Sequence, residues 1–128
     1  MASRFLAVLA CSTLALSGLA PPAGAQDAAT GERLFRTRCA SCHSLEPGQN
    51  RIGPSLNGVI GRKAGSVEGA RYSAGLRDLG ITWDAAQIDT FLANPRAMVK
   101  GSTMTISVTN AADRAAITAY LQSQPSSN

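Results

Sequence analysis

The sequence predicts a single all-α domain. Alternation of apolar and polar residues, the pattern of a half-buried β-strand, is nearly absent from the 128-residue chain. Four stretches show helical spacing of apolar residues instead, and turns rich in Gly and Pro separate them. The chain beyond its first 25 residues has the length of one domain.

The first helix is predicted over residues 27–39, with residue 30 as an alternative start. Leu34 and Phe35 supply its apolar side. Gly31 lies in the first turn, where glycine is a poor helix former. A glycine at this position indicates that another helix crosses very close to it.

A long irregular stretch follows over residues 44–70, with many Gly and Pro residues. Such a stretch argues against a compact domain unless something else organises it. A short helix is then predicted over residues 73–79 and ends at Gly80.

The third helix is predicted to begin with Thr82 as its N-cap and Asp84 in its first turn. The pair Asn94-Pro95 ends it, and residues 96–109 form a loop. The last helix begins at Asn110, with Asp113 three residues later in a capping arrangement. The apolar residues of these two helices are Trp83, Ile88, Phe91, Leu92, Ile117, Tyr120 and Leu121.

The first 25 residues are predicted to be a cleaved signal peptide, which leaves residues 26–128 as the mature domain. Arg4 gives a positive start, residues 5–16 are mostly apolar, and Ala23-Gly24-Ala25 fits the cleavage pattern. The apolar run is shorter than the roughly 20 residues of a membrane helix. We therefore expect export to the periplasm and no membrane span, with an uncleaved anchor as the alternative.

The balance of charge argues against a nucleic-acid partner. The chain has 12 Lys and Arg residues against 8 Asp and Glu residues, and most of the basic residues are arginines. They are scattered along the chain, whereas a nucleic-acid-binding domain needs a basic stripe with reading elements.

Residues 39–43 read Cys-Ala-Ser-Cys-His, which is the attachment signature of a c-type haem. Each cysteine can form a thioether with one haem vinyl group, and His43 then becomes an axial ligand of the iron. Cys39 and Cys42 could instead form a disulfide in an oxidising compartment. A redox C-x-x-C is expected near a βαβ pattern, which this chain lacks. We therefore predict one covalently bound haem c, whose edge residues 44–70 can wrap.

The second axial ligand is open at this point. His43 is the only histidine, so the sixth position belongs to Met, Lys, water or nothing. A thioether ligand suits ferrous iron and raises the reduction potential. Met98 and Met104 follow the predicted signal peptide, and Lys100 is the main rival at alkaline pH.

Five motifs follow one another over residues 30–122. They are Gly31-x-x-x-Phe35-x-x-x-Cys39-x-x-Cys42-His43; Gly53-Pro54-x-Leu56-x-Gly58-Val59-x-Gly61-Arg62-Lys63; Tyr72-Ser73 with Gly80-Ile81-Thr82-Trp83; Leu92-x-Asn94-Pro95 with Gly101-Ser102-Thr103-Met104; and Arg114-x-x-Ile117-x-x-Tyr120-Leu121. With these motifs the chain resembles the class I cytochromes c, near the mitochondrial cytochrome c and bacterial cytochrome c2 branch. The resemblance implies a domain of about four helices wrapped around the haem. Its first and last helices would cross near a right angle, with Gly31 against Tyr120 and Phe35 against Ile117.

The resemblance also implies roles for single residues. The carbonyl of Pro54 would accept a hydrogen bond from His43, and Met104 would be the sixth ligand, which leaves Met98 to packing. The haem propionates need hydrogen-bond donors or a cation. The positions that match the donors of the family are Arg62, Tyr72, Ser73 and Trp83.

Four positions depart from the mitochondrial pattern. Phe91 stands where that pattern has a Tyr whose hydroxyl points at the Met sulfur, and Lys100 replaces a Pro that stiffens the loop. Ile106 replaces an aromatic residue at the haem edge, and Leu76 replaces an Asn. We expect the loop that carries Met104 to open more readily than in the mitochondrial protein.

The resemblance implies a soluble, monomeric one-electron carrier rather than an enzyme, with redox partner proteins that dock transiently at the exposed haem edge. Lys63 and Lys100 are the only lysines, so weak charge steering is expected. The alternative is an electron-accepting haem c subunit of a larger periplasmic oxidoreductase. An enzyme or gas sensor would need an open sixth position, against which Met104 argues.

Overall fold

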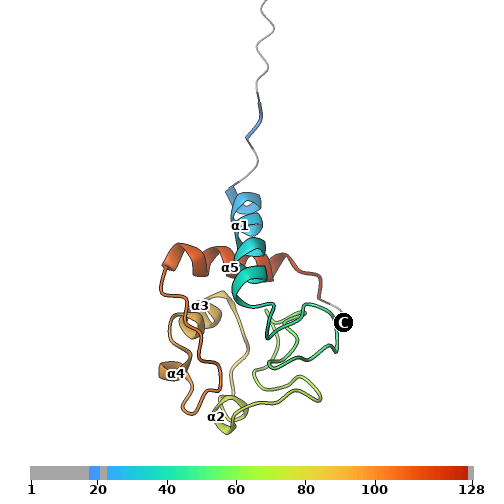
Figure 1. Ribbon diagram of the computed structural model, residues 1–128, viewed down its shortest axis with the longest axis vertical. Helices are drawn as coiled ribbons and strands as arrows, with labels where there is room; N and C mark the ends of the chain where they lie inside the picture. Colours follow the sequence, from blue (N-terminus) through green and yellow to red (C-terminus); the bar gives the residue numbers. More distant parts are fainter. Residues whose placement is uncertain (1–17, 21–22, 127–128) are drawn as a thin grey trace, which may run out of the picture.

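A computed structural model of the chain describes residues 18–20 and 23–126, and within these residues it contains helices and no strand. The helices are α1 (Ala23–Arg38), α2 (Ala74–Arg77), α3 (Ala85–Ala93), α4 (Pro95–Met98) and α5 (Ala111–Ser123) (Figure 1). The all-α prediction is confirmed. Two of the five helices have only 4 residues, so the expectation of about four helices missed one short element.

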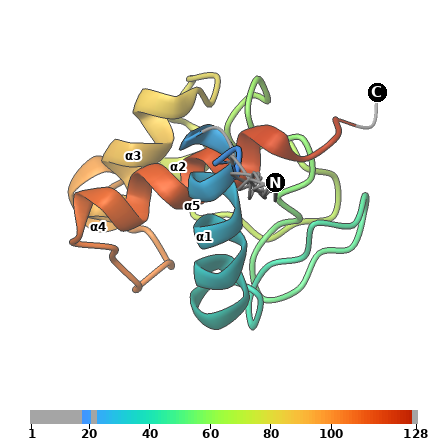
Figure 2. The same ribbon diagram turned by 90° about the horizontal axis from the view of Figure 1, so that it is seen from above.

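Helices α1 and α5 cross at one end of the molecule (Figures 1 and 2). A Cβ atom on Gly31 would lie 1.9 Å from the Ala116 carbonyl oxygen and 2.7 Å from Tyr120 Cβ. Real Cβ atoms essentially never come this close to another atom, so the crossing requires glycine. The rings of Phe35 and Tyr120 pack 5.8 Å apart beside it. The predicted contact of Gly31 with Tyr120 is thus present.

Helix α1 begins earlier than the sequence predicts. It starts at Ala23 rather than at residue 27, and it ends at Arg38, one residue before Cys39. The early start has a local cause, because the segment 23–29 is rich in alanine, the strongest helix former. Most of the predicted signal peptide, residues 1–17 and 21–22, lies outside the described residues.

The third helix is capped by Asp84 and not, as predicted, by Thr82. The Asp84 carboxylate accepts a hydrogen bond from the backbone N–H of Gln87 at 2.7 Å. Thr82 is unavailable because it pairs with Lys63 in an isolated antiparallel bridge. The backbone of Trp83 adds two hydrogen bonds beside that bridge and ties residues 61–63 to the start of α3.

The segment 95–98 is helical, although the sequence analysis placed residues 96–109 in a loop. Asn94 ends α3 as predicted, and its side-chain oxygen then caps α4 by accepting from Ala97 N–H at 3.1 Å. Pro95 is the first residue of α4, where its fixed φ angle suits a helix and its missing N–H costs nothing. The pair Asn94-Pro95 therefore ends one helix and begins the next.

The caps of the remaining helices agree better with the predictions from the sequence. Asn110 caps α5 by accepting from the N–H groups of Ala112 and Asp113 at 2.8 and 3.2 Å. The Asp113 carboxylate lies 3.8 Å from the Arg38 guanidinium, which links α5 to α1. Ser73 caps α2, which ends at Arg77, two residues short of the predicted end.

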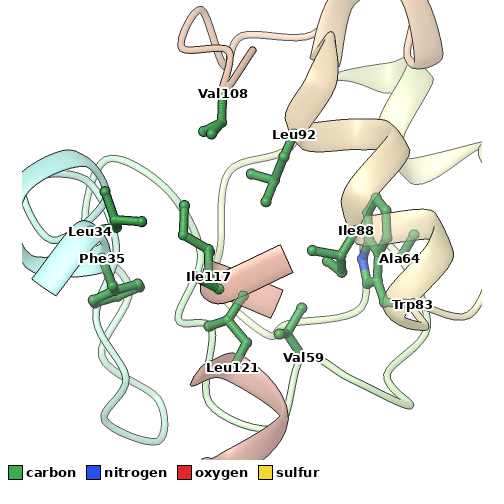
Figure 3. Close-up of a cluster of buried hydrophobic side chains, with 11 residues drawn as sticks. Leu34, Phe35, Val59, Ala64, Trp83, Ile88, Leu92, Val108, Ile117 and Leu121 are labelled. Carbon is green, nitrogen blue, oxygen red and sulfur yellow. The ribbon is translucent and has the colours of Figure 1, made fainter. Parts of the chain in front are cut away.

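The core is a shell of apolar side chains around an open centre (Figure 3). Phe35, Ile117 and Leu121 lie on the side of α1 and α5, and Ile88 and Trp83 lie on the side of α3. None of the described helices has the length and hydropathy needed to cross a membrane.

Candidate haem site

The open centre is an apolar cavity of about 280 Å³. Its lining includes all nine site residues that the sequence predicted: Cys39, Cys42, His43, Pro54, Arg62, Tyr72, Ser73, Trp83 and Met104. The chain therefore brings site residues from four of the five motifs to one place, and Ile117 and Leu121 of the fifth motif also line the cavity. Met98 and Lys100, the rivals of Met104 as sixth ligand, are not among the lining residues.

His43 is held by a hydrogen bond and by close packing. Its ring Nδ1 lies 2.7 Å from the carbonyl oxygen of Pro54. A carbonyl can only accept, so Nδ1 carries the hydrogen and Nε2 keeps a lone pair for a metal. A Cβ atom on Gly53 would lie 2.3 Å from Cε1 of the ring, so only glycine leaves room for the imidazole here. Burial lowers the pKa of His43 most, and the positive charge of Arg62 lowers it further, against the opposing effect of the Pro54 hydrogen bond.

The two cysteines sit in a turn that continues α1. The N–H of Cys39 donates to the Phe35 carbonyl at 2.8 Å, and the N–H of His43 donates to the Cys39 carbonyl at 2.9 Å. Arg51 steadies the same turn by donating to the Ala40 carbonyl at 2.6 Å. Burial raises the pKa of the Cys39 thiol. The turn thus places both sulfur atoms and the imidazole on the cavity wall.

Arg62 brings a positive charge to a mostly apolar wall. Its guanidinium donates to the carbonyls of Asn57 and Ser55 at 2.6 and 2.9 Å, and burial lowers its pKa. A partly buried cation calls for an anion nearby. The two carbonyl partners are neutral, so they orient the guanidinium without compensating its charge.

Three neutral donors line the same cavity. The Tyr72 hydroxyl accepts from the N–H of Val67, and the Ser73 hydroxyl accepts from the N–H of Leu76, both at 3.2 Å. Each hydroxyl therefore keeps its own hydrogen for another acceptor. The described residues offer no acceptor to the Trp83 indole N–H either. Together with Arg62 these groups suit buried carboxylates such as the haem propionates.

Met104 lies on the loop between α4 and α5, and both ends of this loop are fixed. Val99 and Val108 are each 1% exposed, and the N–H of Val108 donates to the Leu92 carbonyl at 2.8 Å. Met104 itself is half-buried and lines the cavity. Phe91, which replaces the family's tyrosine, packs on Trp83 with ring centroids 5.3 Å apart.

The comparisons with known proteins agree with this geometry. The family model "Cytochrome c" matches residues 28–125. The chain belongs to the cytochrome c family. The resemblance to class I cytochromes c of the c2 branch is thereby confirmed.

Several relatives of this cytochrome c are bacterial. It is 44% identical over 99 residues to cytochrome c2 of Rhodoblastus acidophilus, covering 76% of the chain and 92% of that protein. It is 42% identical over 90 residues to cytochrome c2 of Blastochloris viridis, covering 70% of each. The match to the c-type cytochrome cy of Rhodobacter capsulatus is 41% identical over 100 residues, and it covers 77% of the chain but only half of that protein.

The fold has solved counterparts as well. The structure of cytochrome cH from Methylobacterium extorquens superposes with a TM-score of 0.71 at 38% identity, covering 77% of this chain and 99% of that one. The cofactor of this cytochrome c is a covalently bound haem c, and its role is electron transport rather than catalysis. The cavity fits that cofactor because it combines apolar walls, two thiols, an imidazole lone pair and donors for carboxylates.

One residue at the mouth of the cavity, Ile52, has a role that the sequence analysis did not assign. Ile52 is 80% exposed and still lines the cavity, and Ile106 lines it at 42% exposure. Gly53 appears in the sequence motif, but the reason that a glycine is required there is the His43 ring packed against it. A pattern of residues cannot reveal such a contact before the two segments are brought together.

Replacing Arg62 by methionine is expected to destabilise the protein by about 2 kcal/mol. The change leaves the carbonyl of buried Ser55 without its donor, and an unsatisfied buried group costs ~1–3 kcal/mol. Urea unfolding of the haem-loaded protein measures the effect. Arg77→Met is the matched control. Arg77 is exposed, and its side chain takes part in none of the described hydrogen bonds or ion pairs. Equal losses in the two variants would contradict the structural role of Arg62.

Proposed function

We propose that this cytochrome c is a periplasmic one-electron carrier in which His43 and Met104 are the axial ligands of the haem iron. Cys39 and Cys42 form the two thioethers in this proposal. The observation that carries it is the common cavity, which these four residues line while Met98 and Lys100 do not.

The haem supplies an iron that accepts and releases one electron as it cycles between the ferric and ferrous states. The chain supplies the geometry around it. Pro54 fixes the tautomer and orientation of His43 through the 2.7 Å hydrogen bond. The apolar wall excludes water, so the same two ligands can stay in place in both oxidation states.

Arg62, Tyr72, Ser73 and Trp83 are proposed to receive the haem propionates. Each offers at least one hydrogen-bond donor to the cavity, and Arg62 offers a positive charge. Charge-assisted hydrogen bonds are about twice as strong as neutral ones, so Arg62 is expected to contribute most.

The periplasmic location rests on the proposed cleavage after Ala25. The N-terminal mass of protein recovered from the periplasm tests this part of the proposal. A mature chain that begins at Gln26 is expected. Retention in the membrane fraction with residues 1–25 intact would contradict export by a cleaved signal peptide.

The docking surface is proposed to surround the cavity mouth at Ile52 and Ile106, where a partner can approach the haem edge. Two arginines of α1 are already paired, Arg36 with Glu32 and Arg38 with Asp113. These pairs reduce the charge available for steering a partner. The structure around the mouth thus favours a partner contact that is more apolar than electrostatic.

Electron transfer to a redox partner protein is therefore expected to depend only weakly on salt. The second-order rate constant should fall by less than about tenfold between low and moderate ionic strength, since the chain has only two lysines and two arginines of α1 are already paired. Stopped-flow kinetics over a salt series, with mitochondrial cytochrome c measured in parallel, provides the comparison. A slope as steep as that of the mitochondrial protein would show that unpaired charges dominate docking.

Carbon monoxide tests the carrier against a sensor or an enzyme with an open iron. The ferrous protein is expected to keep its spectrum under carbon monoxide, because Met104 holds the sixth position. Rapid formation of a carbon monoxide adduct at neutral pH would overturn the proposal.

Elution as a single chain at high salt is expected, and a stable partner in the purified complex would favour the subunit of a larger oxidoreductase instead.

A further inference from the structure

Helix α2 packs on the start of the Met104 loop more closely than an alanine would permit. A Cβ atom on Gly75 would lie 2.2 Å from the carbonyl oxygen of Lys100 and 3.3 Å from its carbonyl carbon. It would also lie 3.2 Å from Cγ1 of Val99. The main obstacle is backbone, which cannot rotate away as the end of a flexible side chain can.

Both partners in this contact are fixed within their own segments. Ser73 caps α2 at one end, and the N–H of Asp78 closes it at the other by donating to Ala74 at 2.9 Å. On the loop side Val99 is 1% exposed, and its carbonyl accepts from the N–H of Ser102 at 3.0 Å. A rigid turn therefore connects the contact to the residues that follow it.

The contact lies between two walls of the cavity. Ser73 and Leu76, on either side of Gly75, line the cavity from α2. Ser102 and Met104 line it from the loop. Figure 1 shows α2 close to the loop that follows α4 at the lower end of the molecule. Any shift of the Lys100 backbone away from α2 would move the base of the loop that carries Met104.

We propose that Gly75 is a positioning residue for Met104: its missing side chain lets α2 hold the Val99-Lys100 backbone in the place that keeps the Met104 sulfur in the cavity. The inference rests on the proposed role of Met104 as sixth ligand. Gly75 does not touch the haem in this account and acts only through the loop.

Gly75→Ala tests the proposal because local and tertiary effects oppose each other. Alanine favours a helix more than glycine does, so without the contact the variant would be as stable as the original or more so. With the contact, the added methyl displaces the loop. We expect the far-red Met–iron absorption band of the ferric protein to lose at least about half its amplitude at neutral pH, and imidazole to bind on the order of tenfold faster.

Two control variants separate positioning from general loss of stability. Asn110→Ala removes the cap of α5, and Ala74→Leu adds volume at an exposed site on α2. Both are expected to keep the band and the imidazole rate, even though Asn110→Ala lowers the unfolding midpoint. Loss of the band in Asn110→Ala, to the extent seen in Gly75→Ala, would show that stability alone controls the ligand and would overturn the proposal.

Val99→Ala decides the question if Gly75→Ala does not fold. It leaves α2 intact and loosens the same contact from the loop side, so faster imidazole binding is again expected. An unchanged band and rate in the folded variants would overturn the role of Gly75. Absence of the band from the wild-type protein would instead contradict Met104 as ligand, so the two failures are distinguishable.

Discussion

Replacing Met104 by leucine is expected to lower the reduction potential by a few tenths of a volt, a fraction of the ~0.8 V range that axial ligands span. The thioether stabilises ferrous iron, and leucine has no atom that can replace it. Leucine has nearly the volume of methionine, so the apolar wall and the fold should persist. Potentiometric titration of the haem-loaded variant, with its Soret band as a check of haem content, measures the shift.

Met98→Leu is the matched control for this experiment. Met98 ends α4 and packs against the core without lining the cavity. The same substitution there is expected to leave the potential nearly unchanged. A large drop in potential in Met98→Leu, with none in Met104→Leu, would show that Met98 and not Met104 is the sixth ligand. A wild-type potential as low as that of Met104→Leu would show that neither methionine is bound.

The largest effect on stability is expected from Gly31→Ala. The added methyl would lie 1.9 Å from the Ala116 carbonyl, so α1 and α5 must separate. Overpacking of this kind typically costs ~1–3 kcal/mol, and occasionally more, and the gain of about 1 kcal/mol in helix propensity offsets only part of it. We expect a net loss of at least about 2 kcal/mol, because backbone atoms of α5 form the obstacle. Guanidinium unfolding of the holoprotein measures it.

Thr30→Ala provides the comparison for Gly31→Ala. Thr30 is the preceding residue of α1 and is exposed, so alanine there meets no neighbour and slightly favours the helix. Its stability should equal or exceed that of the wild type. If Gly31→Ala were equally stable, the close crossing of α1 and α5 would not be a constraint on this fold.

Cys39, Cys42 and His43 could be predicted from a local motif, whereas the other cavity residues were predicted only through the resemblance to a known family. The cysteines and His43 fall within five residues, and the match of Met104 to the Gly101-x-x-Met104 motif was enough to set Met98 aside. The comparisons confirm the family and its covalent haem, and the individual site residues remain predictions supported by their place on one cavity.

The helix boundaries were less predictable, because tertiary pairing competes with local preference. Thr82 is a good N-cap by type, but its pairing with Lys63 moves the start of α3 to Asp84. Asn94-Pro95 correctly indicated the end of a helix, and the same proline suits the first turn of α4. The sequence alone does not say whether Asn94-Pro95 only ends one helix or also begins the next.

The contact of Gly75 with Lys100 had no sequence pattern that could reveal it. Neither residue belongs to one of the five motifs, and an isolated glycine in a short helix is usually evidence against that helix. Only the packing of α2 on the loop shows why a side chain is excluded there. Close approach of two backbones is a property of the folded chain, which the helical spacing of apolar residues does not encode.

The most direct test of the account is the absorption spectrum of the ferric wild-type protein at neutral pH. The account predicts a strong Soret band together with the weak far-red band that marks a methionine sulfur on ferric iron. A strong Soret band without the far-red band would contradict Met104 as the sixth ligand and, with it, the closed electron-transfer site proposed for this cytochrome c.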